Sequence, residues 1–261
     1  MGMEQIKVEI IDHMGTDLST VNSARVSFDK ESEFIEVWDY DGMCPPDGFT
    51  EDDYYDMDID KGMTGYRKLR DGDKKLIKYL ADHKHMTPFR HNAIQLRCHA
   101  PIFLARQLGK HQAGLSWNEV SRRYVDSEPE FFIPDEWRSR PDGSIKQGSG
   151  VILDDIIVGD DGHGIFELSI SDSYLYCLDT CKGWYNEMLN SNLTPEMARM
   201  VLPQSMMTSW YWTGNLLAFA HVYKERIAEG AQLEAQHFAK ELDKIIRPLY
   251  PVSWDALVGG E

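Results

Sequence analysis

The sequence of 261 residues lacks the long apolar segments that direct a chain to or through a membrane. A membrane-spanning helix needs about 20 consecutive apolar residues, and a secretory signal needs an apolar core of about 7–15. Neither occurs, and Met1 to Ile11 alternate charged with apolar residues. We therefore expect a cytoplasmic protein with no membrane partner.

Basic residues are also scarce, with 27 Lys and Arg against 43 Asp and Glu, for a net charge of −16. Binding to the phosphate backbone of a nucleic acid needs a basic surface, so no nucleic-acid partner is expected. Glu31 to Asp60 alone hold twelve acidic residues and no basic one. We interpret this stretch as an inserted surface loop. The remainder is close to electrical balance, so a local group of arginines there can still bind an anion.

Cysteine is rare, and the four residues are Cys44, Cys98, Cys177 and Cys181. No further Cys or His flanks them at metal-ligand spacing, which favours buried, reduced thiols. Asp56, Asp58 and Asp60 resemble the start of a calcium loop. However, Gly62 comes one position late and Arg67 occupies the closing acidic position. No bound metal is expected.

The hydrophobic pattern predicts one α+β domain over residues 1–261, with surface insertions at about 31–65 and 139–165. Alternating residues predict strands at Lys7–Ile11 and Ala93–Cys98. Helical spacing or a helix-start signal predicts helices at Asp17–Arg25 (capped by Ser19 or Thr20), Asp73–His83, Pro101–His111, Ser171–Leu189, from Thr194, Met206–Ile227 and Gln232–Ile246.

The densest run of polar residues extends from Arg106 to Tyr124 and combines basic groups, hydroxyls, an amide, a carboxylate and two glycines. Arginine and lysine form charge-assisted hydrogen bonds with phosphate, and glycine-rich backbone adds N–H donors. Composition by itself equally permits a solvated, charged helix-loop-helix. The order of the residues decides between the two interpretations.

Ser116 to Tyr124 read Ser-Trp-Asn-Glu-Val-Ser-Arg-Arg-Tyr, which resembles the end of the signature of the flavin-dependent thymidylate synthases. Further segments resemble that family in the same order: Asp17–Phe28, His85–His91, Ala100–Gln107, Phe131–Pro134, Ala198–Pro203, Trp212–Asn215 and Arg226–Gln232. The resemblance covers most of the chain outside the two insertions. It implies a mainly antiparallel sheet flanked by helices and a helical C-terminal half.

The resemblance also implies an activity: transfer of a methylene group from 5,10-methylenetetrahydrofolate to C5 of dUMP, with FAD as cofactor and NADPH as reductant. It places Gln107, Lys110, Glu119, Ser121, Arg123 and Arg199 at dUMP-binding positions, and Thr87, Lys110, His111 and Asn215 at FAD-binding positions. Arg226 falls at the position of the catalytic group that activates the uracil. A permanent positive charge there favours the ionised form of the base. A homotetramer is implied too, and the apolar Met206–Ala220 segment favours it.

The signature departs from the family pattern at its start. Lys110-His111-Gln112 stands for Arg-His-Arg, and one extra residue precedes Ser121. Gly230 stands where a flavin-contacting histidine is usual, and His221 where asparagine is usual. These departures leave two alternatives open: the same fold with altered chemistry, such as dUMP hydroxymethylation or another pyrimidine nucleotide as substrate, or a nucleotide- and flavin-binding protein without turnover.

Overall fold

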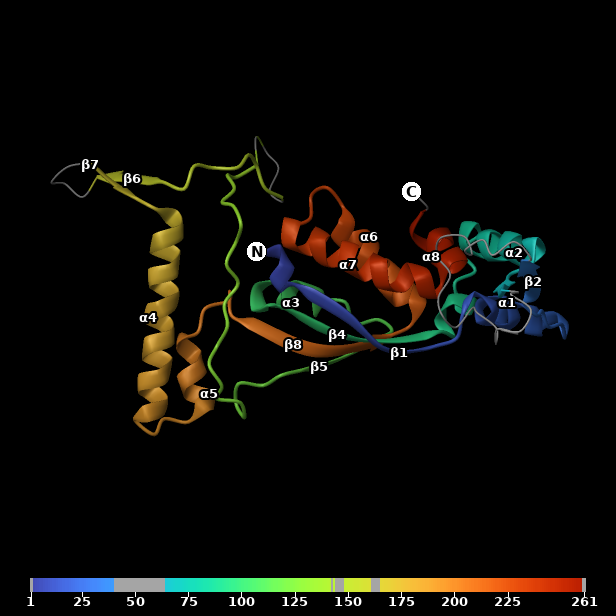
Figure 1. Ribbon diagram of the computed structural model, residues 1–261, viewed down its shortest axis with the longest axis horizontal. Coiled ribbons are helices and arrows are strands. Elements are labelled where there is room, and N and C mark those ends of the chain that lie inside the picture. The colour runs from blue at the N-terminus through green and yellow to red at the C-terminus, as the bar shows by residue number, and fades with distance from the viewer. Residues whose placement is uncertain (1, 40–63, 142, 144–147, 161–164, 260–261) are drawn as a thin grey trace.

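A computed structural model of the chain describes residues 2–39, 64–141, 143, 148–160 and 165–259 (Figure 1). Its central sheet has the strand order β1-β4-β8-β5, with β1 at Lys7–Met14, β4 at Ala93–Pro101, β8 at Met207–Gly214 and β5 at Leu115–Glu119. Two hairpins pair β2 (Ile35–Asp39) with β3 (Thr64–Lys68) and β6 (Ile157–Asp160) with β7 (Ile165–Leu168). Neighbouring strands run antiparallel throughout, which confirms the expected α+β class.

The helices are α1 (Asp17–Arg25), α2 (Asp71–Asp82), α3 (Ile102–Leu108), α4 (Ile170–Asn190), α5 (Pro195–Ala198), α6 (Leu216–Ile227), α7 (Leu233–Leu249) and α8 (Pro251–Val258). Short 3-10 turns are η1 (Met3–Gln5), η2 (Val26–Phe28), η5 (Thr87–Arg90) and η6 (Arg199–Val201). Most of the predicted helices are confirmed within a few residues. The predicted cap of α1 was wrong, because Thr16 caps it: its hydroxyl accepts from the Leu18 N–H, and Ser19 completes the capping box from inside the helix.

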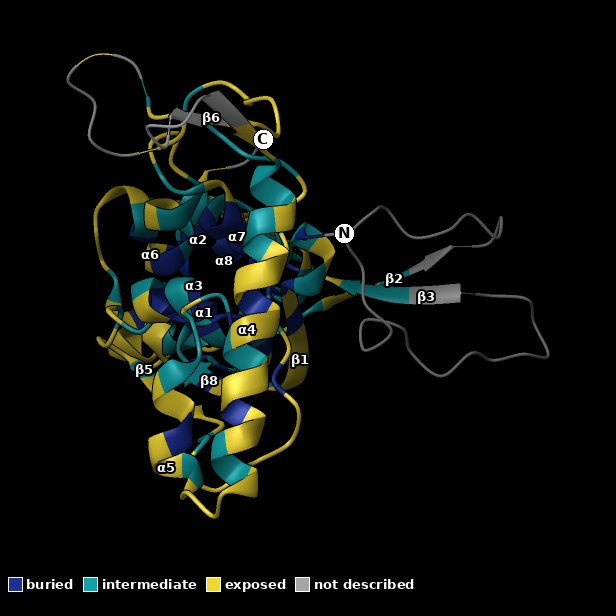
Figure 2. Cartoon of the chain, turned by 90° about the vertical axis from the view of Figure 1, so that its left-hand side faces the viewer, coloured by how far each residue is buried: buried dark blue, intermediate teal, exposed yellow. Residues whose placement is uncertain are grey.

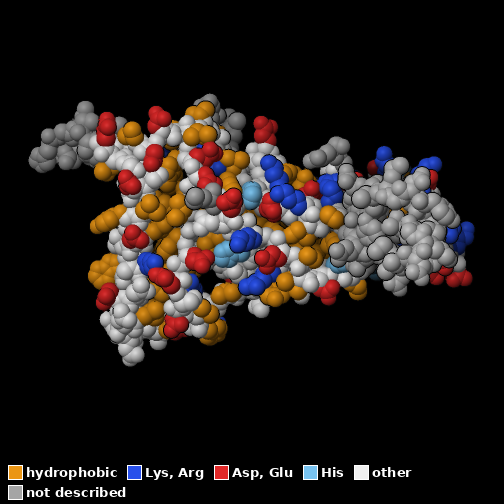
Figure 3. Space-filling model, viewed as in Figure 1, with side chains coloured by type: hydrophobic (Ala, Val, Ile, Leu, Met, Phe, Trp, Pro, Cys, Tyr) orange, Lys and Arg blue, Asp and Glu red, His pale blue; other side chains and the backbone are white. Residues whose placement is uncertain are grey.

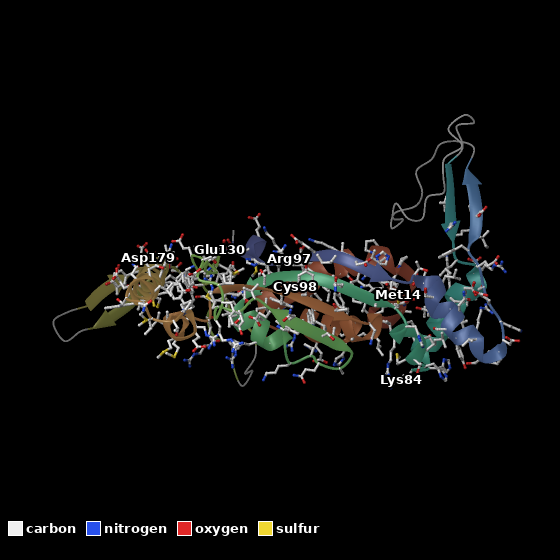
Figure 4. The ribbon with its side chains drawn as sticks, turned by 90° about the horizontal axis from the view of Figure 1, so that it is seen from below. Met14, Lys84, Arg97, Cys98, Glu130 and Asp179 are labelled. Carbon is white, nitrogen blue, oxygen red and sulfur yellow. The ribbon has the colours of Figure 1, made fainter. Side chains whose placement is uncertain are left out.

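The core lies between one face of the sheet and the helices α6 and α7 (Figure 1). Trp210 and Trp212 of β8 point into it, and Phe238 of α7 lies with its ring centroid 6.1 Å from each of theirs. Phe219 of α6 meets the Trp212 ring edge-on at 5.4 Å. In the view from below, the strands lie side by side, with Arg97 and Cys98 labelled on β4 (Figure 4). Cys98 is buried in the core, whereas its neighbour Arg97 is exposed.

The prediction of one helix over Met206–Ile227 was wrong, because its first half is the central strand β8. Residues 207–212 read Met-Thr-Ser-Trp-Tyr-Trp, and such β-branched and aromatic residues favour a strand between two neighbours. Asn215 then starts α6, where its side-chain oxygen accepts from the Ala218 N–H. Most large side chains of this segment, with the exposed Tyr211 as an exception, fill the core of their own chain. They therefore lend no support to an oligomer.

Helix α4 stands at one end of the molecule, away from the sheet, together with α5 and η6 (Figure 1). We call residues 170–201 the arm. Only Leu178 and Tyr185 of α4 are buried, and most of its surface is exposed or intermediate (Figure 2). Cys177 is exposed and Cys181 half-buried, so the expectation of buried thiols is correct for Cys98 and wrong for Cys177.

Both insertions contain structure that the sequence did not predict. In the acidic insertion, strands β2 and β3 lie toward the two ends and pair as a hairpin. Just before β2, the buried hydroxyl of Ser32 donates to Asp73 at 2.5 Å. Arg25 of α1 also binds Asp73, so α1, α2 and the start of the insertion share one ionic cluster. The second insertion contains the β6–β7 hairpin. Cys44 and the calcium-like Asp56 to Asp60 lie outside the described residues.

Asp17 of α1 joins the two ends of the chain. It is buried, and its carboxylate accepts hydrogen bonds from the Val252 and Ser253 N–H groups at 2.8 and 2.7 Å. Val252 and Ser253 begin α8, so a residue near the start of the chain caps a helix near its end. Burial raises the pKa of Asp17, and the bonds from Ser253 and Val252 oppose that rise. Within the described ranges, no helix has the length and apolarity required to cross a bilayer.

Candidate functional site

A pocket of about 640 Å³ opens beside the C-terminal end of α3 and the strand β5. Helix α3 ends at Leu108, and the chain turns through residues 109–114 before β5 starts. The pocket is lined by Ile102, Ala105, Arg106, Gly109, Lys110, His111, Gln112, Leu115, Trp117 and Glu119. Its size suits a small-molecule ligand, and its two cations and one amide suit an anionic one.

Arg226, in the last turn of α6, contacts His111, one of the residues that line this pocket. Its Nε–H donates to Nε2 of His111 at 3.0 Å, and one terminal N–H₂ group donates to the Gln107 carbonyl at 3.4 Å. The residues are 115 and 119 positions apart in the chain. The structure therefore brings together three predicted site residues and orients the guanidinium between two fixed acceptors.

His111 is half-buried and its pKa is lowered to about 4. Burial is the main cause, followed by the positive charge of Arg226 and then by His221, while Glu225 opposes the shift. The imidazole is therefore neutral at physiological pH. The ring of His221, one turn before Glu225 on α6, meets the His111 ring edge-on with centroids 5.9 Å apart.

Two further contacts hold α3 and the loop that follows it, residues 109–114, against α6 and the start of α7. Gly114 has φ +76°, and a Cβ there would lie 2.6 Å from the side-chain nitrogen of Asn215, so only glycine fits this approach. Gln107 donates from its amide to Gln232 Oε1 at 2.6 Å, just before α7. Asn215, a predicted flavin-binding residue, thus lies beside the loop that carries Lys110 and His111.

Glu119 closes the other side of the pocket at the end of β5. One carboxylate oxygen accepts from the Thr208 hydroxyl at 2.8 Å, and the other accepts from the Trp117 indole N–H at 3.2 Å. Trp117 stacks on Trp210 with ring centroids 4.3 Å apart. The carboxylate is therefore held against the sheet, with its orientation fixed by two donors.

The remaining predicted residues lie elsewhere in this chain. Arg123 is exposed beyond β5, where its guanidinium contacts the Tyr124 ring, and the hydroxyl of Ser121 accepts from the Arg123 N–H at 3.3 Å. Arg199 is exposed on the arm, where it donates to the Glu196 carbonyl. Thr87 lines a separate pocket of about 760 Å³ that also contains Phe28 and Tyr79.

The sequence did not predict that His221 and Gln232 contact residues of this site. His221 stands where the resembled family usually has asparagine, but its separation of five residues from Arg226 does not by itself place the two on one helix face. No cluster of three or more His, Cys, Asp or Glu suited to a metal occurs in the part of the chain that the structure describes.

The chain is similar to known proteins over nearly its whole length. Residues 9–252 match the family model Thy1, described as thymidylate synthase complementing protein. A flavin-dependent thymidylate synthase of Kosmotoga olearia is 31% identical, with 98% of this chain and 91% of that protein aligned. One from Thermus thermophilus is 28% identical, with 95% and 74% aligned.

A solved structure is similar as well. It is a UMP/dUMP methylase, PolB, from Streptomyces cacaoi, bound with 5-Br dUMP. The TM-score is 0.66 at 26% sequence identity, with 96% of this chain and 93% of that chain covered. The similarity thus extends through the fold as well as the sequence motifs.

Proposed function

The chain belongs to the flavin-dependent thymidylate synthase family, and from that premise we propose that it converts dUMP to dTMP. The methylene carbon of 5,10-methylenetetrahydrofolate forms a bond to C5 of the uracil, while its bonds to the folate nitrogens break, tetrahydrofolate leaves and C5 loses its proton. Bound FAD, reduced by NADPH, supplies the hydride that makes this carbon a methyl group.

The observation that carries the proposal is the contact of Arg226 with His111 and the Gln107 carbonyl beside a cation-containing pocket. Two acceptors orient the guanidinium, so its charge is fixed before substrate binds. A preorganised cation stabilises negative charge that develops on the uracil as C5 becomes nucleophilic. Arg226 is the catalytic residue in this scheme, and Lys110, Gln107 and Glu119 bind the nucleotide.

The residues around the pocket also fit FAD. Lys110 and Arg106 provide cations for a pyrophosphate, and neutral His111 and the Asn215 amide provide hydrogen-bond donors. Thr87 belongs to a different pocket, which contains the aromatic rings of Phe28 and Tyr79. A dinucleotide that contacts both Thr87 and His111 has to bind residues of two different pockets. This requirement supports a site shared between copies of the chain.

We propose that the active enzyme is a homotetramer in which one copy supplies Arg226 and another supplies Arg199. Arg199 lies exposed on the arm, and it does not line the pocket beside His111. Apolar side chains gather over the α4 end of the molecule (Figure 3). The exposed large apolar residues of the arm include Tyr176, Trp184, Met197 and Met200. Exposed apolar surface of this kind marks an interface between proteins. Arg123 and Ser121 complete the phosphate contacts from the end of β5.

Methylation of UMP is a second candidate, favoured by the structural similarity to a UMP/dUMP methylase. The variant start of the signature keeps dUMP hydroxymethylation and binding without turnover as further alternatives. Product analysis distinguishes all four. dTMP supports the main proposal, 5-methyl-UMP the second, 5-hydroxymethyl-dUMP the third, and NADPH oxidation without a modified nucleotide the last.

The decisive experiment uses the purified chain with FAD, NADPH and methylenetetrahydrofolate, and supplies dUMP or UMP in separate reactions. We expect a yellow protein that forms dTMP and retains its flavin through gel filtration. Absence of dTMP from a folded, flavin-loaded protein would refute the proposed function.

A further inference from the structure

The hydrogen bond between Arg226 and His111 determines which nitrogen of the imidazole carries the proton. A guanidinium remains protonated in proteins and has only donors, so Nε of Arg226 donates. Nε2 of His111, 3.0 Å away, must therefore offer its lone pair. An imidazole that accepts at Nε2 is neutral, and its single proton is on Nδ1.

We propose that Arg226 and His221 are positioning residues that hold His111 as a neutral imidazole with its proton on Nδ1, ready to donate a hydrogen bond to a ligand in the pocket. The identity of that ligand, a carbonyl or other electron-rich atom of the flavin or nucleotide, rests on the proposed function. The protonation state of His111 in the free protein does not.

The groups around His111 favour this state from more than one side. Arg226 and His221 face it from α6, and a positive charge on the imidazole would be repelled by the guanidinium. Glu225, by contrast, favours the charged form. Arg106, Lys110 and Glu119 line the same pocket, with two cations against one carboxylate. Burial acts in the same direction as the cations.

The Nδ1–H group is available to a ligand. No hydrogen bond from it to another group is found among the described residues, although His111 lines the pocket. A neutral donor stabilises partial negative charge on a ligand oxygen without adding a second cation next to Arg226. The positive charge beside the substrate then stays concentrated on Arg226, where the proposed chemistry needs it.

His221 supplies what a smaller polar residue cannot. Its ring meets the His111 ring edge-on at a centroid distance of 5.9 Å, which limits rotation of the imidazole away from Arg226. Substitution His221→Asn removes that ring while keeping a polar group at the same helical position. We expect it to loosen the Arg226–His111 contact without affecting the fold, because His221 is exposed.

The first test is NMR of the flavin-free protein with ¹⁵N-labelled histidine, with His111→Gln used to assign the signals. We expect an unprotonated Nε2 and a protonated Nδ1 from pH 6 to 9. Arg226→Lys and His221→Asn should give a mixture of the two neutral forms. Arg226→Ala should raise the His111 pKa by about 1 unit, because the guanidinium contributes less to the lowering than burial does. Glu225→Gln should shift it in the opposite direction.

The matched control is Lys240→Gln, which removes an exposed cation of α7 and should leave the His111 signals unchanged. A protonated imidazole at pH 7, or a proton on Nε2, would overturn the proposal. So would a Lys240→Gln shift as large as that of Arg226→Ala, because the effect would then be general electrostatics. These spectra involve no turnover, so an inactive enzyme with the expected tautomer refutes the proposed function alone.

The second test concerns the donated hydrogen bond and uses FAD binding, measured by fluorescence quenching at pH 7.5. The side-chain amide of His111→Asn keeps a donor close to the Nδ1 position, whereas His111→Leu has none. We expect His111→Leu to bind FAD about tenfold more weakly than His111→Asn, the value of one net hydrogen bond. Equal affinities would show that His111 donates no bond to the flavin.

Discussion

The sheet core and the arm use large apolar side chains in opposite ways. Trp210 and Trp212 are at most 1% exposed between β8 and α7, whereas Trp184 on α4 is 61% exposed. The core buries its aromatic residues within one chain. The arm carries a predicted substrate residue, Arg199, on a surface that the described part of the same chain leaves open. The comparison indicates that stability resides in the core, and it agrees with our proposal that the arm serves assembly and completes the site.

The largest expected effect is the loss of a core tryptophan. Trp212→Ala removes a fully buried ring that packs against Phe219 and Phe238. We expect the free energy of unfolding to fall by about 3–5 kcal/mol. Chemical denaturation followed by circular dichroism measures the change. The matched control on the arm is Trp184→Ala, which should alter this free energy little when oligomers are absent. Similar losses for the two variants would contradict the division between core and arm.

Arg226 and Arg199 extend the comparison to catalysis. Arg226 lies on α6, which packs against the sheet core, whereas Arg199 lies on the arm. Arg226→Ala should lower kcat by about 10²–10³ even at saturating dUMP, since it removes stabilisation specific to the transition state. Arg199→Ala should mainly raise KM, because a phosphate contact is similar in the ground and transition states. Steady-state kinetics against dUMP concentration separate the two.

Circular dichroism and gel filtration of both variants provide the control for folding and assembly. Near-normal kcat in Arg226→Ala would refute its catalytic role while leaving the family membership intact. A loss of kcat in Arg199→Ala that excess dUMP does not restore would mean that the arm takes part in the chemical step.

A smaller effect is expected from changing the exposed surface of the arm. Trp184→Ser should weaken the oligomer by about tenfold or more, since exposed tryptophans are often the residues on which an interface depends. Analytical ultracentrifugation over a range of concentrations measures this, with Tyr211→Ser, which changes an exposed aromatic residue on β8, as the control. An unchanged oligomer, or a wild-type monomer at micromolar concentration, would remove the arm from the interface.

The smallest effect concerns the acidic insertion. Replacement of residues 40–63 by a short Gly/Ser linker, which retains β2 and β3, should change the free energy of unfolding by less than about 1 kcal/mol, because like charges repel and contribute little to a core. The wider replacement of Glu31–Asp60 should be more harmful, since it removes the buried bond of Ser32 to Asp73. Thermal melting compares the two, and a lost cooperative transition in the shorter replacement would show that the segment packs structurally.

Regular periodicity made much of the fold predictable. Helices α2 and α4 repeat apolar residues at helical spacing, and β4 alternates apolar with polar residues. Strand β8 was mistaken for a helix because its two tryptophans and one methionine lie beside the apolar start of α6 with no proline between them. A buried central strand and a buried helix have similar composition, so only tertiary pairing with β4 and β5 distinguishes them.

The site was predictable where a motif carried it and unpredictable where it depends on contacts between distant segments. Lys110, His111 and Glu119, which the family resemblance names as site residues, line one pocket, and their binding roles stay predictions. The bond from Arg226 to His111 joins residues 115 positions apart, and no local pattern reports it. Arg123, Arg199 and Thr87 lie outside that pocket, so their predicted roles remain proposals that depend on a second copy of the chain.

The cap that Asp17 places on α8 has a consequence for synthesis of the protein. Its partner Ser253 lies 236 residues later, and β1 must also wait for β4 before it can pair. Asp17 emerges from the ribosome long before the residues of α8 are synthesised. Contacts between residues so far apart in the chain also slow folding. The buried carboxylate therefore has no partner N–H groups until residues 252 and 253 have been synthesised. Deletion of residues 251–258 would leave Asp17 without these donors and helix α1 without its anchor to α8.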